Sequence, residues 1–229
     1  LVAIWEYDRR PANGASFVCH GQWHRIVSDD PDYYGQIVAY EKGVCTALGI
    51  RNGPSHGEVK WYQGAPILVE VGSRCHGGDG LWVDVAEECL GHSQASMTVD
   101  AYLDPNGRFA ALSADGSERV KFGALKWMIS YEEGILKGYN EAFLDEIRNM
   151  ESYRGDQLFV KPGGIMKKTQ NCFTWGGCVK LVNADEAQLK RDYYRIEEME
   201  QSGLFILDHT QVIPQLSYVG VVDPFSTGA

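Results

Sequence analysis

The segment 64–92, GAPILVEVGSRCHGGDGLWVDVAEECLGH, carries the most structural information in this sequence. Ile67, Val69 and Val71 alternate with other residues, as in a half-buried strand, and a cysteine and a glycine-rich turn follow. A second short strand, WVDV, then runs into a short helix that ends at Cys89. Asp84 is therefore expected inside an apolar strand. It must line a cleft or be anchored by hydrogen bonds there, because an unpaired buried charge is costly.

The rest of the first 130 residues is also predicted to be rich in strands. Short runs of β-branched and aromatic residues are separated by Gly, Pro, Asn and Asp, which is typical of strands and turns. The expected strands are 2–7, 36–40, 58–62, 66–71, 97–103 and 108–112, with a tight hairpin turn at 104–107.

The pattern changes near Ser130. A capping box of Ser130 and Glu133, followed by apolar residues at every fourth position from Ile135, predicts an amphipathic helix over 131–151. A second helix is expected over 185–202, with Gly203 as its stop. Further strands are expected at 157–161, 204–207 and 218–222. The fold class is thus α+β, with a domain 1–130 and an extension 131–229 that packs on it because no linker separates them.

Composition excludes several classes of protein. The chain of 229 residues has a net charge of −10 and 44% hydrophobic residues, so intrinsic disorder is excluded. Scattered basic residues argue against nucleic acid as a partner, and no run approaches the roughly 18 apolar residues of a membrane span. The chain starts at Leu1 without a signal peptide, and we expect a processed mature protein, a monomer, with no cofactor and no metal site.

The cysteines predict the compartment. There are six, an even number, and no spacing matches a zinc site or a CxxC motif. Three sequential disulfides are one of many connectivities open to them, and disulfides imply a secreted, extracellular protein. The alternative is a cytosolic protein with free buried thiols. The residues are Cys19, Cys45, Cys75, Cys89, Cys172 and Cys178.

The segment 64–92 resembles the core of the six-stranded double-psi β-barrel of expansins, barwin-like proteins and small secreted endoglucanases. The resemblance rests on a strand ending in Arg-Cys, a glycine-containing turn and Val-Asp-Val before a short helix. YYGQIVAYEKGVCTALGI before it and ERVKFGALKW after it follow the order of that family, so the resemblance covers residues 30–130. It implies an N-terminal double-psi-like barrel with a packed α+β extension.

The resemblance also implies a catalytic site. Asp84 takes the position of the proton donor, and Asp8 is the nearest match to a second carboxylate. Two carboxylates across a groove are what glycoside hydrolysis needs. Sugar rings stack on aromatic faces, for which the candidates are Trp5, Trp61, Trp82 and Trp127. The competing interpretation is that the tryptophans belong to the core and that Asp84 accepts structural hydrogen bonds.

Together these features predict a secreted protein that acts on cell-wall polysaccharide, as an endoglucanase-like glycoside hydrolase or as an expansin-like protein. The alternative is a non-catalytic secreted effector, toxin or protease-inhibitor-like protein that binds a host extracellular protein, because one barrel serves binding as readily as hydrolysis. His20 and His24 have the spacing of a metal pair on a helix, but no third ligand is apparent, and we expect surface histidines.

Overall fold

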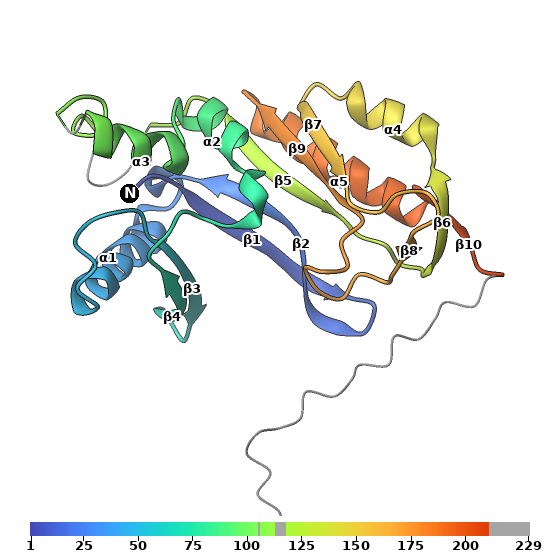
Figure 1. The fold of residues 1–229 in the computed structure, drawn as a ribbon, viewed down its shortest axis with the longest axis horizontal. Helices are drawn as coiled ribbons and strands as arrows, with labels where there is room; N and C mark the ends of the chain where they lie inside the picture. Colours follow the sequence, from blue (N-terminus) through green and yellow to red (C-terminus); the bar gives the residue numbers. More distant parts are fainter. Residues whose placement is uncertain (105, 113–117, 211–229) are drawn as a thin grey trace, which may run out of the picture.

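The computed structural model describes residues 1–104, 106–112 and 118–210. Its centre is a five-stranded antiparallel sheet with the order β1-β2-β5-β9-β7 (Figure 1). The strands are β1 (Ile4–Ala12), β2 (Ala15–Arg25), β5 (Phe122–Met128), β9 (Gly177–Asn183) and β7 (Tyr153–Leu158). Asn13 and Gly14 join β1 to β2 with φ of 51° and 81°. Asn-Gly is the favoured pair for such a turn, so the long first hairpin has a local cause.

Helices cover both faces of this sheet. Helix α5 (Glu186–Gln201) packs on β5 and β9 from one face, and α2 (Val83–Leu90) packs on the same strands from the other. Ala124 and Met128 belong to the core under α5, whereas Leu125 and Trp127 belong to the core under α2. We call these the α5 face and the α2 face. The strict alternation along β5 follows from the pleat, which sends successive side chains to opposite faces.

A smaller sheet adjoins the α5 face. It has the order β10-β6-β8, with β6 at Gly134–Tyr139, β8 at Ile165–Met166 and β10 at Phe205–Asp208. Helix α4 (Glu141–Arg148) contacts β7 and α5. These elements lie on the right of Figure 1, and their apolar residues extend the core under α5.

The remaining elements lie at the other end of the molecule (Figure 1). Strands β3 (His56–Tyr62) and β4 (Ala65–Gly72) form a separate antiparallel hairpin, against which α1 (Pro31–Ala47) packs. Helix α3 (Gln94–Leu103) follows α2. An isolated hairpin is marginally stable in water, so the contact with α1 is needed to hold it.

The expected six-stranded barrel is wrong, because the sheets of the described residues are open and antiparallel. The expected strand 36–40 lies within helix α1. Asp30 caps that helix by accepting a hydrogen bond from the Tyr33 amide at 3.0 Å, and Pro31 occupies its first turn. These start signals outweigh the β-branched and aromatic content on which the strand was predicted.

Two other expected strands are also absent from their predicted places. Residues 97–103 lie in helix α3, which Ser93 caps through the Ser96 amide at 3.1 Å. Residues 108–112 form turns. Of the expected hairpin turn at 104–107, Pro105 falls outside the described residues, the Gly107 amide donates to the Asp104 carbonyl at 3.0 Å, and helix α3 precedes it in place of a strand; the expected strand 218–222 lies wholly beyond residue 210.

The expected helix over 131–151 is wrong in its first half. Residues 134–139 form strand β6, and α4 begins only after Asn140, whose side chain caps it. Ile135 and Tyr139 are four residues apart, and four is a multiple of the strand period as well as close to the helical one. The spacing alone therefore could not separate the two structures.

Other predictions are confirmed. Strands 58–62 and 66–71 lie within β3 and β4, helix 185–202 matches α5 with Asp185 as its cap, and strand 204–207 matches β10. Strand 2–7 overlaps β1, whereas the expected strand 157–161 shares only Gln157 and Leu158 with β7 and was placed too late in the chain. Each of these elements carries a strong local signal, either a turn, a cap or a glycine stop.

The six cysteines are all free thiols, so the predicted disulfides are wrong. Cys89 and Cys178 are buried as small apolar side chains in the core under α2. The prediction of an oxidising, extracellular compartment rested on these disulfides and loses that support. No helix in the part of the chain that the structure describes is both long and apolar enough to cross a membrane.

Candidate functional site

Two glutamates face each other on the β3–β4 hairpin. Gln63 and Gly64 form its turn with φ of 50° and 81°, and a bulge at Val69, between the pairs Val59–Leu68 and Glu58–Glu70, brings Glu58 opposite Glu70. Side chains of directly paired residues lie on the same face, and like charges in that position destabilise a hairpin. The bulged part of the hairpin therefore places two carboxylates in a repulsive arrangement that a bound cation would relieve. We call these residues the Glu58–Glu70 pair.

Few groups neutralise this pair. The Tyr7 hydroxyl, on β1, donates to Glu58 Oε1 at 3.0 Å. Burial, and then the nearby Glu58 carboxylate, raises the pKa of Tyr7, so the hydroxyl keeps its proton and remains a donor. Arg74 Nη2 lies 3.9 Å from Glu70 Oε1 on an exposed part of the surface. The pair thus keeps most of its negative charge available for a ligand.

Two histidines lie at the open end of the hairpin. The rings of His56 and His76 meet edge to face, with centroids 4.4 Å apart. Burial lowers the pKa of His56, and burial with His56 and Arg74 lowers the pKa of His76 to about 4. Both rings are therefore neutral at pH 7 and add no positive charge beside the glutamates.

One side chain ties this end of the hairpin to helix α3. Gln94 Nε2 donates to the Ser55 carbonyl at 2.8 Å, and Gln94 Oε1 accepts from the His76 amide at 2.7 Å. On the other side the Leu68 amide donates to the Tyr40 hydroxyl of α1 at 3.0 Å. The hairpin that carries the Glu58–Glu70 pair is therefore held on two sides.

The pair supplies two carboxylates, which is the number a protein contributes when a substrate provides the remaining ligands of a cation. The described residues contain no group of three or more His, Cys, Asp or Glu side chains able to hold a metal by themselves. Mg²⁺, however, is usually bound by one or two carboxylates together with water and the phosphates of a substrate. The Glu58–Glu70 pair fits this donor set.

The structure does not bring the two predicted catalytic carboxylates together. Asp84 lies in the first turn of α2, not in a strand, and its exposed carboxylate pairs with Lys180 Nζ at 2.7 Å. Asp8 lies on the α5 face, where it pairs with Arg10 at 2.9 Å and accepts from the Tyr193 hydroxyl at 2.9 Å. Since α2 and α5 cover opposite faces of the sheet, no groove separates these two carboxylates.

The four predicted sugar-stacking tryptophans are also scattered. Trp82 and Trp127 are 3% and 4% exposed, which leaves no ring face for a ligand. Trp127 stacks on Trp175 with ring centroids 4.1 Å apart. The other two are partly buried: Trp5 meets the edge of His24, and Trp61 packs on Tyr33 of α1.

His20 and His24 are not surface residues, as was expected, but are each only 2% exposed. They lie on β2, an inner strand of the sheet that pairs with β1 along one edge and with β5 along the other. The spacing of four residues was interpreted as helical, but the bulge at His20 breaks the strand alternation, so that His20 lies near Arg10 and Glu197 on the α5 face while His24 meets Trp5 on the α2 face.

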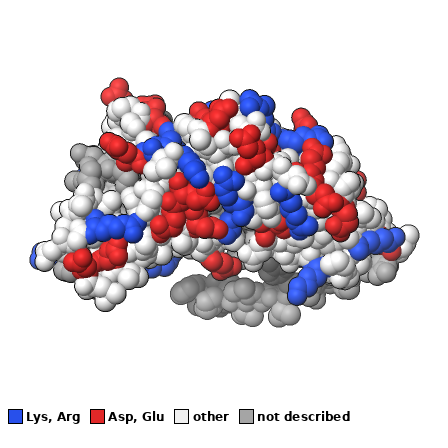
Figure 2. Space-filling view, turned by 90° about the horizontal axis from the view of Figure 1, so that it is seen from above, with Lys and Arg blue, Asp and Glu red and all other residues white. Residues whose placement is uncertain are grey.

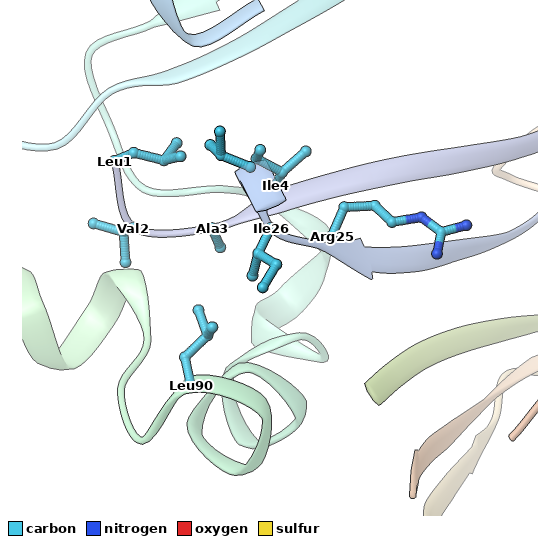
Figure 3. Close-up of a pocket in the computed structure, with 8 residues that line it drawn as sticks. Leu1, Val2, Ala3, Ile4, Arg25, Ile26 and Leu90 are labelled. Carbon is cyan, nitrogen blue, oxygen red and sulfur yellow. The ribbon is translucent and has the colours of Figure 1, made fainter. Parts of the chain in front are cut away.

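A small cavity near the N-terminus is not a candidate site. It lies between the start of β1, the end of β2 and helix α2, and is lined by apolar side chains such as Leu1, Ile26 and Leu90 (Figure 3). Its volume is about 10 Å³. That is room for one water at most, so it is a packing gap.

Sequence analysis missed Glu58, Glu70 and Arg74. Both strands of the hairpin were predicted, but the turn at Gln63 and Gly64 alone would place Glu58 opposite Val69, and the bulge that places it opposite Glu70 was not predicted. The contact with Tyr7, 51 residues away in sequence, had no local signal.

Comparison with solved structures defines the class of fold. The chain superimposes on L-amino acid ligase from Bacillus licheniformis with a TM-score of 0.71 and 17% identity, covering 90% of this chain and 50% of that one. It superimposes on phosphoribosylglycinamide synthetase from Anaerococcus prevotii with a TM-score of 0.65 and 16% identity, covering 89% and 49%. The fold is thus an ATP-grasp-like α+β domain.

The chain is also similar in sequence to a known synthase. The chain is 28% identical to dapdiamide A synthase of Enterobacter agglomerans over 205 residues, which covers 87% of this chain and 46% of that protein. The chain thus spans about half the length of the relatives it matches. No protein-family model matches it.

These findings overturn the resemblance to double-psi barrel proteins. The predicted polysaccharide-active protein, its alternative of a secreted effector, toxin or inhibitor, and their polysaccharide or host-protein partners were wrong, because all of them depended on that barrel. The matched pattern, Arg-Cys followed by glycines and Val-Asp-Val, spans the end of β4 and the start of α2. A short pattern of this kind does not distinguish a second strand from the first turn of a helix.

Proposed function

We propose that this chain belongs to an ATP-dependent ligase that joins the carboxylate of one amino acid to the amine of another. The observation that carries the proposal is the 28% identity to dapdiamide A synthase along 87% of the chain. The fold shared with an L-amino acid ligase supports it. In such a reaction an amide bond forms, ATP is cleaved to ADP and phosphate, and the carboxylate oxygen leaves with the phosphate.

The Glu58–Glu70 pair is assigned to the nucleotide. Glu58 and Glu70 would hold Mg²⁺, which when bound supplies positive charge to the phosphate oxygens of ATP. The Tyr7 hydroxyl orients the Glu58 carboxylate by donating to Oε1, so its second oxygen is left for the cation. Gln94 keeps the hairpin in place from the side of α3.

Neutral His56 and His76 lie beside the pair and bring no competing positive charge. The proposed role of this chain within the ligase is therefore to hold the metal and the phosphates. Because the chain spans about half of its relatives, other parts of the site are left outside the proposal.

The test is amino-acid-dependent cleavage of ATP by the purified protein. We expect ADP release in the presence of Mg²⁺ and a matching pair of amino acids, with the dipeptide detected by mass spectrometry. Glu58→Gln and Glu70→Gln should each lower the rate by about 100-fold or more, because each removes a charge that stabilises the developing phosphate charge through the metal. Tyr7→Phe should have a smaller effect.

The matched control is Glu151→Gln, an exposed glutamate far from the hairpin in the turn before β7, which should leave the rate unchanged. Cleavage of ATP that is independent of every amino acid tested, or equal rates for Glu58→Gln and the parent protein, would contradict the proposal.

A further inference from the structure

An arginine lies beside the Glu58–Glu70 pair and is joined to it through one tyrosine ring. Arg9 Cζ stands 4.7 Å from the centroid of the Tyr7 ring, and the Tyr7 hydroxyl donates to Glu58 at 3.0 Å. Tyr7 and Arg9 are two residues apart on β1, so both side chains lie on the same face of the strand. The Tyr7 ring therefore holds the Arg9 guanidinium close to the proposed metal site.

Arg9 has no carboxylate partner among the described residues, although the protein is strongly acidic. Of the arginines, which all fall within the described residues, only Arg9 and Arg51 form no ion pair there. Its neighbour Arg10 shows the contrast, since it points to the α5 face and pairs with Asp8 and Glu197 at 2.9 and 2.7 Å. A net charge of −10 makes an unpaired, exposed arginine beside two glutamates unusual.

The strand is irregular at this position. Asp8 pairs with Gly21, but Arg9 pairs with Cys19, so that His20 is left over on β2 as a bulge. Bulges bend the strand that carries them and often redirect side chains next to functional sites. Here the bulge falls directly opposite Arg9, and a second register shift follows between Arg10 and Ala12.

We propose that Arg9 binds an oxyanion of a substrate at the Glu58–Glu70 site and so contributes to its specificity. The inference rests on the proposed ligase function. The guanidinium fork matches the oxygens of a carboxylate or a phosphate, and stacking on Tyr7 restricts the side chain before the ligand arrives. The charges of the two glutamates would already balance that of a divalent cation. A substrate anion that binds at the site therefore needs a further positive charge from the protein.

Two substrate groups have this chemistry. One is a phosphate of ATP. The other is the free carboxylate of the amino acid that supplies the amine, because that carboxylate takes no part in the new bond and stays ionised throughout. The kinetic parameters for each substrate distinguish these two sources.

The experiment compares Arg9→Gln and Arg9→Lys with the parent protein. We expect Arg9→Gln to raise the KM of one anionic substrate by about 10- to 100-fold, as for loss of a hydrogen bond to a charged group, with little change in kcat. Arg9→Lys should recover part of the loss. A rise in the KM of ATP identifies a phosphate as the partner, and a rise in the KM of the amine substrate identifies its carboxylate.

A substrate analogue gives a second readout. If the carboxylate is the partner, the parent protein should discriminate against the amide of the amine substrate, and Arg9→Gln should lose that discrimination. Arg51→Gln is the control, since Arg51 is also exposed and unpaired and should behave as the parent does. Melting temperatures of all variants show whether they are folded.

The outcomes separate the two proposals. A parent protein that turns over ATP with amino acids, together with an Arg9→Gln variant whose KM values are unchanged, overturns the role of Arg9 and leaves the ligase proposal standing. A fall in kcat with unchanged KM values also overturns it. A parent protein without amino-acid-dependent turnover overturns the ligase proposal, and the role of Arg9 with it.

Discussion

At the scale of single residues, burial on β2 changes the pKa values of two histidines. His24 is 2% exposed, and neither of its ring nitrogens has a hydrogen-bond partner within the described residues. Burial, with Arg119 adding to it and Asp29 opposing it, lowers the pKa of His24 to about 4. Burial has the same effect on His20, whose pKa is also about 4. Both rings are neutral in the folded protein at pH 7.

These histidines should make the protein sensitive to mild acid. The folded-state pKa lies below the ordinary value of 6.5, so the unfolded chain binds more protons between these values. Stability is therefore complete above pH 6.5 and is lost as the pH falls toward 4, by up to about 1.4 kcal/mol per pH unit for each histidine. Urea unfolding at pH 7, 6 and 5 measures this loss.

His24→Phe keeps a ring in place and should flatten that dependence. A slope in His24→Phe that equals the slope of the parent would show that His24 is not the titrating group.

At the scale of elements, glycine is required where a neighbouring strand or helix comes too close to leave room for a Cβ atom. Gly21 lies on β2 where α5 crosses the sheet, and a Cβ there would lie 2.6 Å from the Leu125 carbonyl oxygen and would also meet the Tyr193 hydroxyl. The backbone of β5 cannot move aside without breaking its pairing with β9. Gly35, in the middle of α1, has no heavy atom within 4 Å of the same position.

The two glycines should therefore respond in opposite ways to alanine. Gly21→Ala should destabilise the protein by about 1–3 kcal/mol through overpacking. Gly35→Ala should stabilise it by about 0.5–1 kcal/mol, because alanine has the higher helix propensity. Thermal melts of the two variants provide the measurement, and a lowered melting temperature for Gly35→Ala or an unchanged one for Gly21→Ala would refute this account.

At the scale of the whole molecule, the central sheet joins the two halves of the sequence. Strands β1, β2 and β5 come from the first 130 residues, and β7 and β9 come from the rest. The core under α5 likewise contains Trp23 and Ala124 together with Leu189 and Ile196. Over the face shown in Figure 2, acidic and basic side chains are interspersed and do not form one basic patch.

Because the core is shared, we expect residues 1–130 and the remainder to unfold together. Thermal unfolding should be a single transition with the same midpoint by calorimetry and by circular dichroism. A truncated protein ending at residue 130 would leave one edge of β5 unpaired and the core under α5 uncovered, so it should not unfold cooperatively. Two separate transitions in the parent, or a cooperative melt of the truncated protein, would contradict this expectation.

Local signals in the sequence were sufficient for some elements. The β3–β4 hairpin, helix α5 and strand β10 were all predicted, because alternation, a two-residue turn, an Asp cap and a glycine stop act over a few residues. The turn of this hairpin places both strands side by side, but the bulge that brings Glu58 opposite Glu70 was not predicted from these local signals.

Tertiary structure decided the rest. Residues 36–40 of α1 and 97–103 of α3 were predicted as strands, but there the local caps Asp30 and Ser93 were the signals that the prediction missed. The order β1-β2-β5-β9-β7 joins segments more than 100 residues apart, and the placement of Tyr7 and Arg9 beside Glu58 depends on it. Contacts over such distances leave no periodic pattern in the sequence, because they depend on how whole elements bury their apolar faces against one another.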